Sequence, residues 1–294
     1  NYSTADAQGA YVYGVYGGYL YNNGGSINAS ATVVDHGRAY AYGVDVESRS
    51  YAHLYSNGTL GAHAYGGSYT GLAVSQAATV YSAVAYADAY LHGNVNASTQ
   101  VLDHSVALAT GIEMDAPFGI SYLYDDSTML VTAQAGDYSA AVAEGASVFG
   151  HYYSSAMHYG DLTAYARAGG NGSSAFASGV YVGANAGSAY LYNDGSITAH
   201  ARVDDGASFA TAIGSSVYSA YTATVYNTGD IHAYAESGAN GHSYAFGSVV
   251  NTGGQQGEAY MYNFGYSMVA HAYAGDGGVA VATASTVTGA FGAY

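Results

Sequence analysis

Residues 191–202 read LYNDGSITAHAR, residues 54–64 read LYSNGTLGAHA, and residues 225–235 read VYNTGDIHAYA. Each segment holds an apolar residue, a tyrosine, a turn rich in Asn and Gly, and then alanine at every second position. Phrases that recur along one chain are the sequence signature of a repeat architecture. The fold therefore depends on how far this phrase extends and with what period.

A column of alanines sets the period. Its members are Ala5, Ala39, Ala73, Ala107, Ala141, Ala175, Ala210, Ala245 and Ala280, so successive differences are 34, 34, 34, 34, 34, 35, 35 and 35. Two residues later the chain has Ala7, Ala41, Ser75, Ala109, Ala143, Ala177, Ala212, Gly247 and Ala282. Four residues later it has Gly9, Gly43, Ala77, Gly111, Gly145, Gly179, Gly214, Val249 and Ala284. Composition bias alone does not keep small residues in one register nine times, so the chain is a repeat protein.

The quoted phrase is the second half of each unit. Its leading apolar residue recurs as Leu20, Leu54, Leu91, Leu123, Met157, Leu191, Val225 and Met261. After a turn of variable length comes a second Ala-x-Ala pair, at Ala62/Ala64, Ala133/Ala135, Ala164/Ala166, Ala199/Ala201, Ala233/Ala235 and Ala270/Ala272. These segments alternate with period two, and glycine interrupts them too often for helices, so the pattern predicts strands.

Alternation also predicts which face is buried. In the second strand the residues between and beyond the alanines include His63, His200, Arg167 and Arg202, so this side faces solvent and the alanines point inward. In the first strand the intervening column is largely apolar, as at Val74, Leu108, Val142 and Phe176, among others. We therefore expect that both faces of this strand are covered, by a connecting segment or by another molecule.

Two architectures fit these strands. In an antiparallel barrel the Asn-Gly turns would form tight hairpins, but a barrel has no reason to repeat residue identity at fixed register. In a parallel stack, identical residues lie above one another, and ladders of Asn, Tyr or Thr become favourable. The sequence therefore predicts an all-β fold: one parallel β-solenoid domain over residues 1–294, with about eight repeats of ~34 residues and a thin Ala/Gly-rich core.

Charge restricts the partners. The chain has 20 acidic residues, four arginines and no lysine, with a net charge of −16. Nucleic acid is excluded as a partner, because binding phosphates requires cations. No apolar run approaches the ~18 residues of a membrane-spanning helix.

No motif predicts an enzyme, a cofactor or a metal site. The acid pairs Asp125-Asp126 and Asp204-Asp205 are interpreted as turn residues, although carboxylates also serve the sugar-cleaving β-helix enzymes. The segment 275–280 matches G-x-G-x-x-A but precedes a strand, so it is interpreted as a turn. His63, His200 and His271 share a column in non-adjacent units, and we interpret them as surface residues.

The units YLYNDGSITAHAR, TVYNTGDIHAYAE and YLYNNGGSINASA resemble repeats of bacterial surface β-solenoids, namely autotransporter passengers and filamentous-haemagglutinin-like adhesins. The resemblance spans nearly the whole chain. It implies an exported protein at the cell surface with a structural or adhesive role. We therefore expect a non-enzymatic, tyrosine-rich subunit of an extracellular fibre, or alternatively an adhesin stalk that binds a glycan or a host surface.

Self-association is the expected partnership. Neither end of the sequence carries a polar capping repeat, which predicts either an excerpt of a longer array or head-to-tail stacking of copies. The nearly continuous register favours head-to-tail stacking into an open filament. Protonation of all 11 histidines would change the net charge from −16 to −5 (−16 + 11), so we also expect lateral bundling through tyrosine-bearing surfaces at acidic pH.

Overall fold

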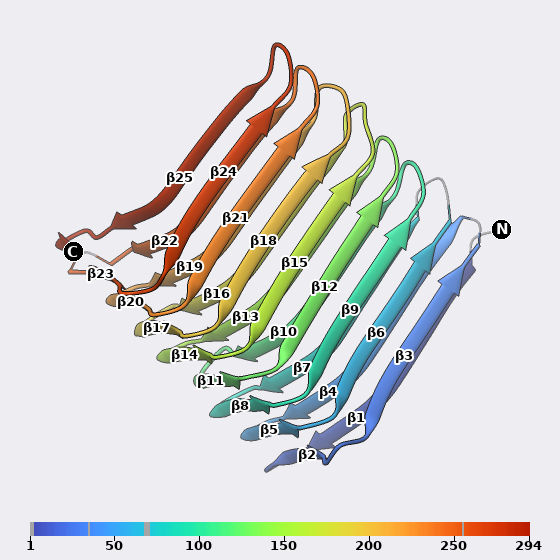
Figure 1. The fold of residues 1–294 in the computed structure, drawn as a ribbon. Helices are drawn as coiled ribbons and strands as arrows, with labels where there is room; N and C mark the ends of the chain where they lie inside the picture. The colour runs from blue at the N-terminus through green and yellow to red at the C-terminus, as the bar shows by residue number, and fades with distance from the viewer. Residues whose placement is uncertain (1–2, 35, 68–70, 255) are drawn as a thin grey trace.

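The computed structural model describes residues 3–34, 36–67, 71–254 and 256–294. These residues form a parallel β-solenoid of about eight turns with three strands in each full coil, as the sequence predicts (Figure 1). Each repeat of about 34 residues winds once. None of the described segments forms a helix, and so none forms a helix that could cross a membrane.

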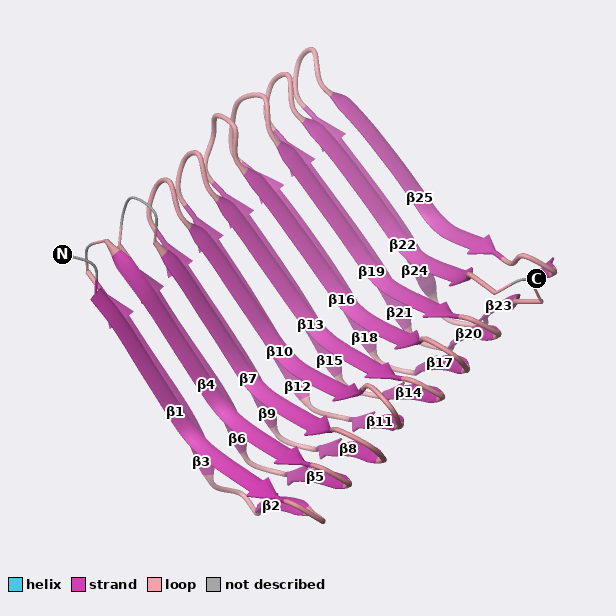
Figure 2. Ribbon diagram, turned by 180° about the vertical axis from the view of Figure 1, so that it is seen from behind, coloured by secondary structure: helices cyan, strands magenta, loops and turns pink. Residues whose placement is uncertain are grey.

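Three parallel sheets, named A, B and C here, run along the stack (Figures 1 and 2). Sheet A contains β1 (Ser3–Gly14), β4 (Gly37–Ser48), β7 (Leu72–Ser82), β10 (Val106–Ala116), β13 (Ala140–Gly150), β16 (Ser174–Ala184), β19 (Phe209–Ser219), β22 (His242–Thr252) and β25 (Val279–Thr288). Sheet B contains β2 (Gly18–Asn22), β5 (Tyr51–Ser56), β8 (Tyr86–Leu91), β11 (Ile120–Asp125), β14 (Tyr153–His158), β17 (Ser188–Asn193), β20 (Thr222–Asn227), β23 (Glu258–Asn263) and β26 (Gly292–Ala293). Sheet C contains β3 (Ser26–Val33), β6 (Thr59–Gly66), β9 (Asn94–Val101), β12 (Thr128–Ala135), β15 (Asp161–Ala168), β18 (Ser196–Val203), β21 (Asp230–Ser237) and β24 (Ser267–Ala274).

The alanine columns point into the core, as predicted. Ala141 pairs with Ala175, and the alanines of both Ala-x-Ala phrases are fully buried in the middle of the stack, for example Ala107 and Ala199. The Asn-Gly turns of the quoted phrase are corners between sheets B and C rather than hairpins. In the unit at residues 191–202, the chain leaves β17 at Asn193 and enters β18 at Ser196.

The predicted register is wrong in one unit of the first alanine column. The residue paired with Ala210 is Ser243, and Ala245 belongs to the second column beside Ala212. The intervals are therefore 33 (243 − 210) and 37 (280 − 243), because corner lengths vary: residues 220–221 follow β19, whereas residues 253–257 follow β22. This register also places Gly247, rather than Val249, in the glycine column.

Other slips occur in the second half of the unit. Val131/Ala133, not Ala133/Ala135, matches Ala164/Ala166. The column of leading apolar residues also differs from the prediction in two units. The observed pairing places Ala89 in this column rather than Leu91, and Ala156 rather than Met157. A slip of two residues keeps the side chain on its predicted face, but the one-residue slip at Met157 places that side chain on the outer face.

The apolar column of the first strand lies on the outer face of sheet A. Val74, Leu108, Val142 and Phe176 are all partly exposed. No described strand packs over this face, so the expected cover by a connecting segment is not found among the described residues.

A glycine column bends each strand of sheet A and sets the thickness of the core. Along β16, inward residues alternate up to Gly179, and then Val180 is also buried, so the alternation changes phase there. A Cβ atom on Gly179 would collide with the carbonyl oxygen of Gly214 in the next coil and with the Ile197 side chain of sheet C. In β7 this column has Ala77 instead of glycine. In the same coil, the sheet C position equivalent to Ile197 is occupied by Val95, which is smaller.

We expect Gly179→Ala to destabilise the protein by about 1–3 kcal/mol, because the added methyl group overpacks the core against the Gly214 carbonyl oxygen and Cγ2 of Ile197. Because Ile197→Ala removes Cγ2, it should cost less in the Gly179→Ala background than in the parent. Guanidinium unfolding of the four proteins in the double-mutant cycle measures the coupling. Simple additivity of the two single losses would contradict the packing account.

Candidate functional site

Sheet B carries a continuous row of aromatic rings on its outer face. We name this row the aromatic ladder; its members are Tyr21, Tyr55, His92, Tyr124, Tyr159, Tyr192, Tyr226 and Tyr262. Neighbouring ring centroids are 5.2 to 6.3 Å apart, within the range of favourable aromatic pairs. The ladder follows the stack from the first coil to the eighth.

Two members of the ladder, His92 and Tyr159, lie just beyond the ends of β8 and β14 and so outside the strict repeat register. In the paired column of sheet B, Tyr124 is followed by Met157, which interrupts the row of tyrosines. The ring of Tyr159, just beyond β14, replaces it and lies 5.2 Å from Tyr124 and 5.4 Å from Tyr192 between centroids. Sequence reasoning missed this ladder because Tyr159 does not align with the other tyrosines.

More aromatic side chains widen this face in the first coils. Tyr19 and Tyr21 are 52% and 62% exposed, and both contact His53. The carboxylate of Asp88 accepts a hydrogen bond from the Tyr51 hydroxyl at 3.1 Å and lies 2.9 Å from Nδ1 of His53. Burial, and then the charge and hydrogen bond of Asp88, raise the pKa of Tyr51 to about 12. The Tyr51 phenol is therefore neutral at physiological pH.

Inside the corner beneath the ladder, polar side chains form their own column. Asn193 Nδ2 donates to Asn227 Oδ1 at 2.7 Å, and Asn227 Nδ2 donates to Asn263 Oδ1 at 2.7 Å. This is the asparagine ladder that a parallel stack favours. It ties successive coils together at the Asn-rich turns of the repeat phrase.

The same column holds a buried ion pair. Asp125 was interpreted as a turn residue, but it ends β11 and is buried, with its Oδ2 2.8 Å from Nδ1 of His158. Nε2 of His158 lies 3.2 Å from the carbonyl oxygen of Ser196. The imidazole thus links Asp125 in the preceding coil to Ser196 in the following coil. The pair is closed off from solvent, so its role is structural.

We expect His158→Asn to destabilise the protein by about 3–5 kcal/mol, because it leaves the buried Asp125 carboxyl group without its imidazole partner. The double variant Asp125→Asn/His158→Asn should recover most of this loss, since two stacked amides reproduce the pairing of Asn193 and Asn227. Thermal unfolding measures both. A double variant no more stable than His158→Asn would contradict the ladder account.

The outer face of sheet A is different in chemistry. A hollow of about 320 Å³ at the glycine bend is lined by Glu144, Phe176, Tyr181 and Ile213, with several serines. Burial, and then Glu113, raise the pKa of Glu144. Three coils toward the N-terminus from Glu144, burial and then Glu47 raise the pKa of Asp45 to about 6. This face combines apolar surface with carboxylates that are poorly solvated.

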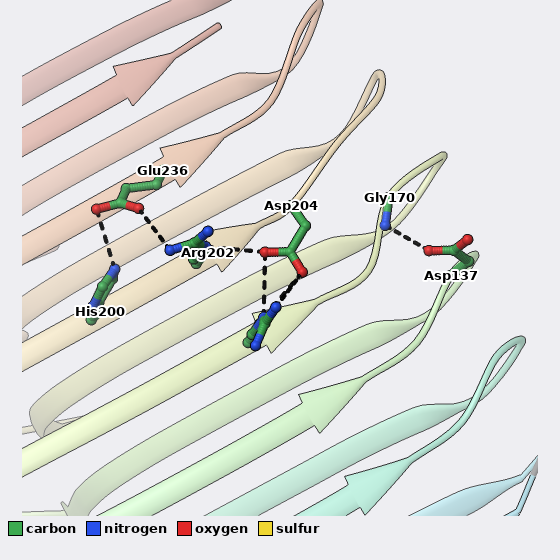
Figure 3. Close-up of polar contacts among 7 residues, drawn as sticks. Asp137, Gly170, His200, Arg202, Asp204 and Glu236 are labelled. Carbon is green, nitrogen blue, oxygen red and sulfur yellow. Dashed lines mark hydrogen bonds and ion pairs between the residues drawn. The ribbon is translucent and has the colours of Figure 1, made fainter.

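The acid pair Asp204-Asp205 lies in the loop between sheets C and A, as expected for turn residues. Asp204 accepts hydrogen bonds from two stacked arginines, Arg167 at 2.7 Å and Arg202 at 3.0 Å (Figure 3). Although burial acts in the opposite direction, these two hydrogen bonds lower the pKa of Asp204. Sequence reasoning interpreted this pair as turn residues and missed Arg167, which comes from the previous coil.

Glu236 extends this surface network. It lies 3.8 Å from Arg202 and 3.6 Å from His200 (Figure 3). Burial lowers the pKa of His200, and the nearby Glu236 opposes that shift. The network uses two of the four arginines and leaves no exposed cluster of positive charge in this part of the stack.

The three histidines of the second strand do not meet. His200 and His271 are two coils apart with the ring of Tyr234 between them, and His63 pairs with Ser98. Among the described residues, no group of three or more His, Cys, Asp or Glu side chains is arranged to hold a metal ion. The segment 275–278 is the turn between β24 and β25, as predicted.

No protein family, curated protein sequence or solved structure matches this chain.

Proposed function

We propose that this protein is a non-enzymatic structural subunit of an extracellular fibre or surface filament, built from β-solenoids that stack end to end. The observation that carries the proposal is the complementarity of the two open edges of the described stack. The resemblance of the repeats to bacterial surface solenoids supports the extracellular location.

Backbone directions make the edges complementary. Ser3 N–H donates to His36 O toward β4, and Val279 N–H donates to Gly241 O toward β22. Neighbouring residues of a parallel strand direct their backbone groups to opposite sides. Thr4 and Asp6 therefore direct theirs to the open edge of β1, whereas Ala280 and Ala282 direct theirs to the open edge of β25. Within the stack, a strand edge formed like the open edge of β25 always pairs with an edge formed like the open edge of β1.

The incomplete burial of alanines on the inner faces of the end coils also supports a second copy of the chain as the partner. Ala5 and Ala7 in the first coil and Ala270 and Ala272 in the last strand of sheet C are only partly buried, although their counterparts in the middle are fully buried. Another coil of the same repeat has the shape and register to cover them. A second copy supplies such a coil, and repetition of this contact gives an open filament.

We expect Ala282→Pro to abolish fibres, because proline removes a backbone donor at the open edge of β25 without removing a bond to β22. Ala282→Ser, which keeps the N–H group, should form fibres like the parent. Electron microscopy and sedimentation of the three proteins, with circular dichroism to confirm folding, make the test. Fibres from a folded Ala282→Pro protein, or a parent that stays monomeric at high concentration, would refute the proposal.

Lateral bundling is the second part of the proposal. The aromatic ladder offers a long row of rings as a contact surface, whereas the net charge of −16 keeps rods apart. As pH falls from neutral to about 5, Asp45, whose pKa is about 6, loses its negative charge, and burial also raises the pKa values of Asp115 and Glu144. Repulsion between rods therefore weakens.

We expect light scattering to increase as pH falls to about 5, since Asp45 is then largely protonated and the rods repel one another less. Replacing the exposed Tyr19 and Tyr21 with Ser should reduce the increase, because these rings widen the contact surface. Replacing Tyr266, which lies outside the ladder, should not. Flat scattering over this range, or equal behaviour of both variants, would contradict lateral contact through the aromatic face.

An adhesin stalk is the alternative function. The exposed rings of Tyr19 and Tyr21 favour it, because sugars stack on flat aromatic surfaces. Binding to a glycan array by the parent, lost on replacement of these two tyrosines with Ser, would support the adhesin over the purely structural role.

A further inference from the structure

Tyrosine is the main oxidisable side chain of this protein. The chain has 35 tyrosines and five methionines, but no cysteine, tryptophan or lysine. Disulfides and lysine-derived bonds are thus excluded as covalent reinforcement. Cysteine and tryptophan, which compete with tyrosine for one-electron oxidants, are also absent. An oxidant that reaches this protein therefore acts largely on phenol rings.

Four successive coils bring phenol rings together on the outer face of sheet B. We name Tyr124, Tyr159, Tyr192 and Tyr226 the tyrosine quartet. Their neighbouring ring centroids are 5.2, 5.4 and 5.6 Å apart, and the last pair is stacked with 13° between planes. Parallel pairing of β11, β14, β17 and β20 holds the rings at this spacing. Such preorganisation converts an encounter of two radicals into a reaction between fixed neighbours.

The quartet is accessible to solvent. Tyr159 is 39% exposed, and the other three rings are partly exposed. Burial, and then Tyr192 and Tyr124, raise the pKa of Tyr159, so its hydroxyl keeps its proton at neutral pH. Loss of an electron is thus accompanied by loss of that proton.

We propose that the tyrosine quartet is a site of oxidative dityrosine formation, which joins successive coils covalently. The inference does not rest on the filament, because the bonds form within one molecule.

The oxidant is a peroxide used by a haem peroxidase. Each of two tyrosines loses one electron and its phenolic proton and becomes a phenoxyl radical. The two radicals form one bond between ring carbons ortho to the oxygens, and the hydrogens on those carbons move to the oxygens, which restores both phenols. Hydrogen peroxide takes up the two electrons and two protons and becomes two waters. The protein loses two hydrogen atoms per cross-link.

Phenols outside the quartet are also close to its ends: the ring centroid of Tyr90 lies 6.2 Å from Tyr124 and that of Tyr262 lies 6.2 Å from Tyr226, both farther apart than neighbours within the quartet. Tyr260 and Tyr294 form a separate stacked pair with centroids 5.2 Å apart. Each bond in the quartet joins residues 35, 33 or 34 positions apart (159 − 124, 192 − 159, 226 − 192). Closing loops of this length restricts the unfolded chain, so cross-linked protein should unfold at a higher guanidinium concentration.

The experiment treats dilute, folded protein with horseradish peroxidase and hydrogen peroxide, and reads dityrosine fluorescence and the mass of cross-linked peptides. Cleavage before aspartate places the four tyrosines in separate peptides, 115–124, 137–160, 161–193 and 205–229. Fragmentation then locates the joined residues. The same reaction on guanidinium-unfolded protein is the reference for chance coupling.

The matched variants keep every ring and remove only hydroxyls. Tyr159→Phe/Tyr192→Phe changes the quartet, whereas Tyr16→Phe/Tyr266→Phe changes two tyrosines that are 86% and 96% exposed and lie outside the ladder. We expect the parent and the second variant to yield quartet cross-links, each lacking two hydrogens, and the first variant to lose them.

Three outcomes would overturn the proposal. The first is cross-linking dominated by Tyr16 and Tyr266, which would mean that exposure alone decides the product. The second is the same set of cross-links in folded and unfolded protein. The third is oxidation that stops at methionine, visible as a gain of oxygen without dityrosine.

Discussion

In-register parallel pairing between successive coils is the interaction on which the rest of the structure depends. Ala141 lies beside Ala175 and Ile197 beside Ile231, so the neighbours of a residue are the residues at the same position in the coils on either side. A side-chain contact that is favourable between two coils is therefore repeated between further coils along the stack. The asparagine column, the aromatic ladder and the stacked arginines all follow from this one constraint.

The thin core is a consequence of the same stacking. Because Gly179 and its equivalents approach both the next coil and sheet C, sheets A and C pack closely and the strands of sheet A bend there. Each alanine contributes little hydrophobic energy, so backbone hydrogen bonds and close packing supply a large share of the stability. The coil that has Ala77 in the glycine column of sheet A has the smaller Val95 at the position of Ile197 in sheet C, so volume is balanced across the core there.

The outer faces can carry different chemistry because backbone pairing and the inner columns, rather than the outer side chains, define the coil. Sheet B presents phenols with little charge, the outer face of sheet A presents apolar groups beside poorly solvated carboxylates, and the loop edge carries the network of Arg167, Arg202 and Asp204. A rod with distinct faces is suited to ordered contact with its own copies. This division supports the proposed assembly of the protein with its own copies.

The sequence alone determined the period, the strand character and the inward direction of the alanines, since period and alternation are local properties of the chain. It did not determine register where corners change length: Ser243 and Ala245 are both small residues on the same face, and a slip of two residues leaves the pattern unchanged. It also missed the partners that only winding brings together, such as Arg167 with Asp204 and Asp125 with His158. The aromatic ladder required the tertiary structure because the ring of Tyr159 reaches the row from outside the repeat register, and only coordinates place it between Tyr124 and Tyr192.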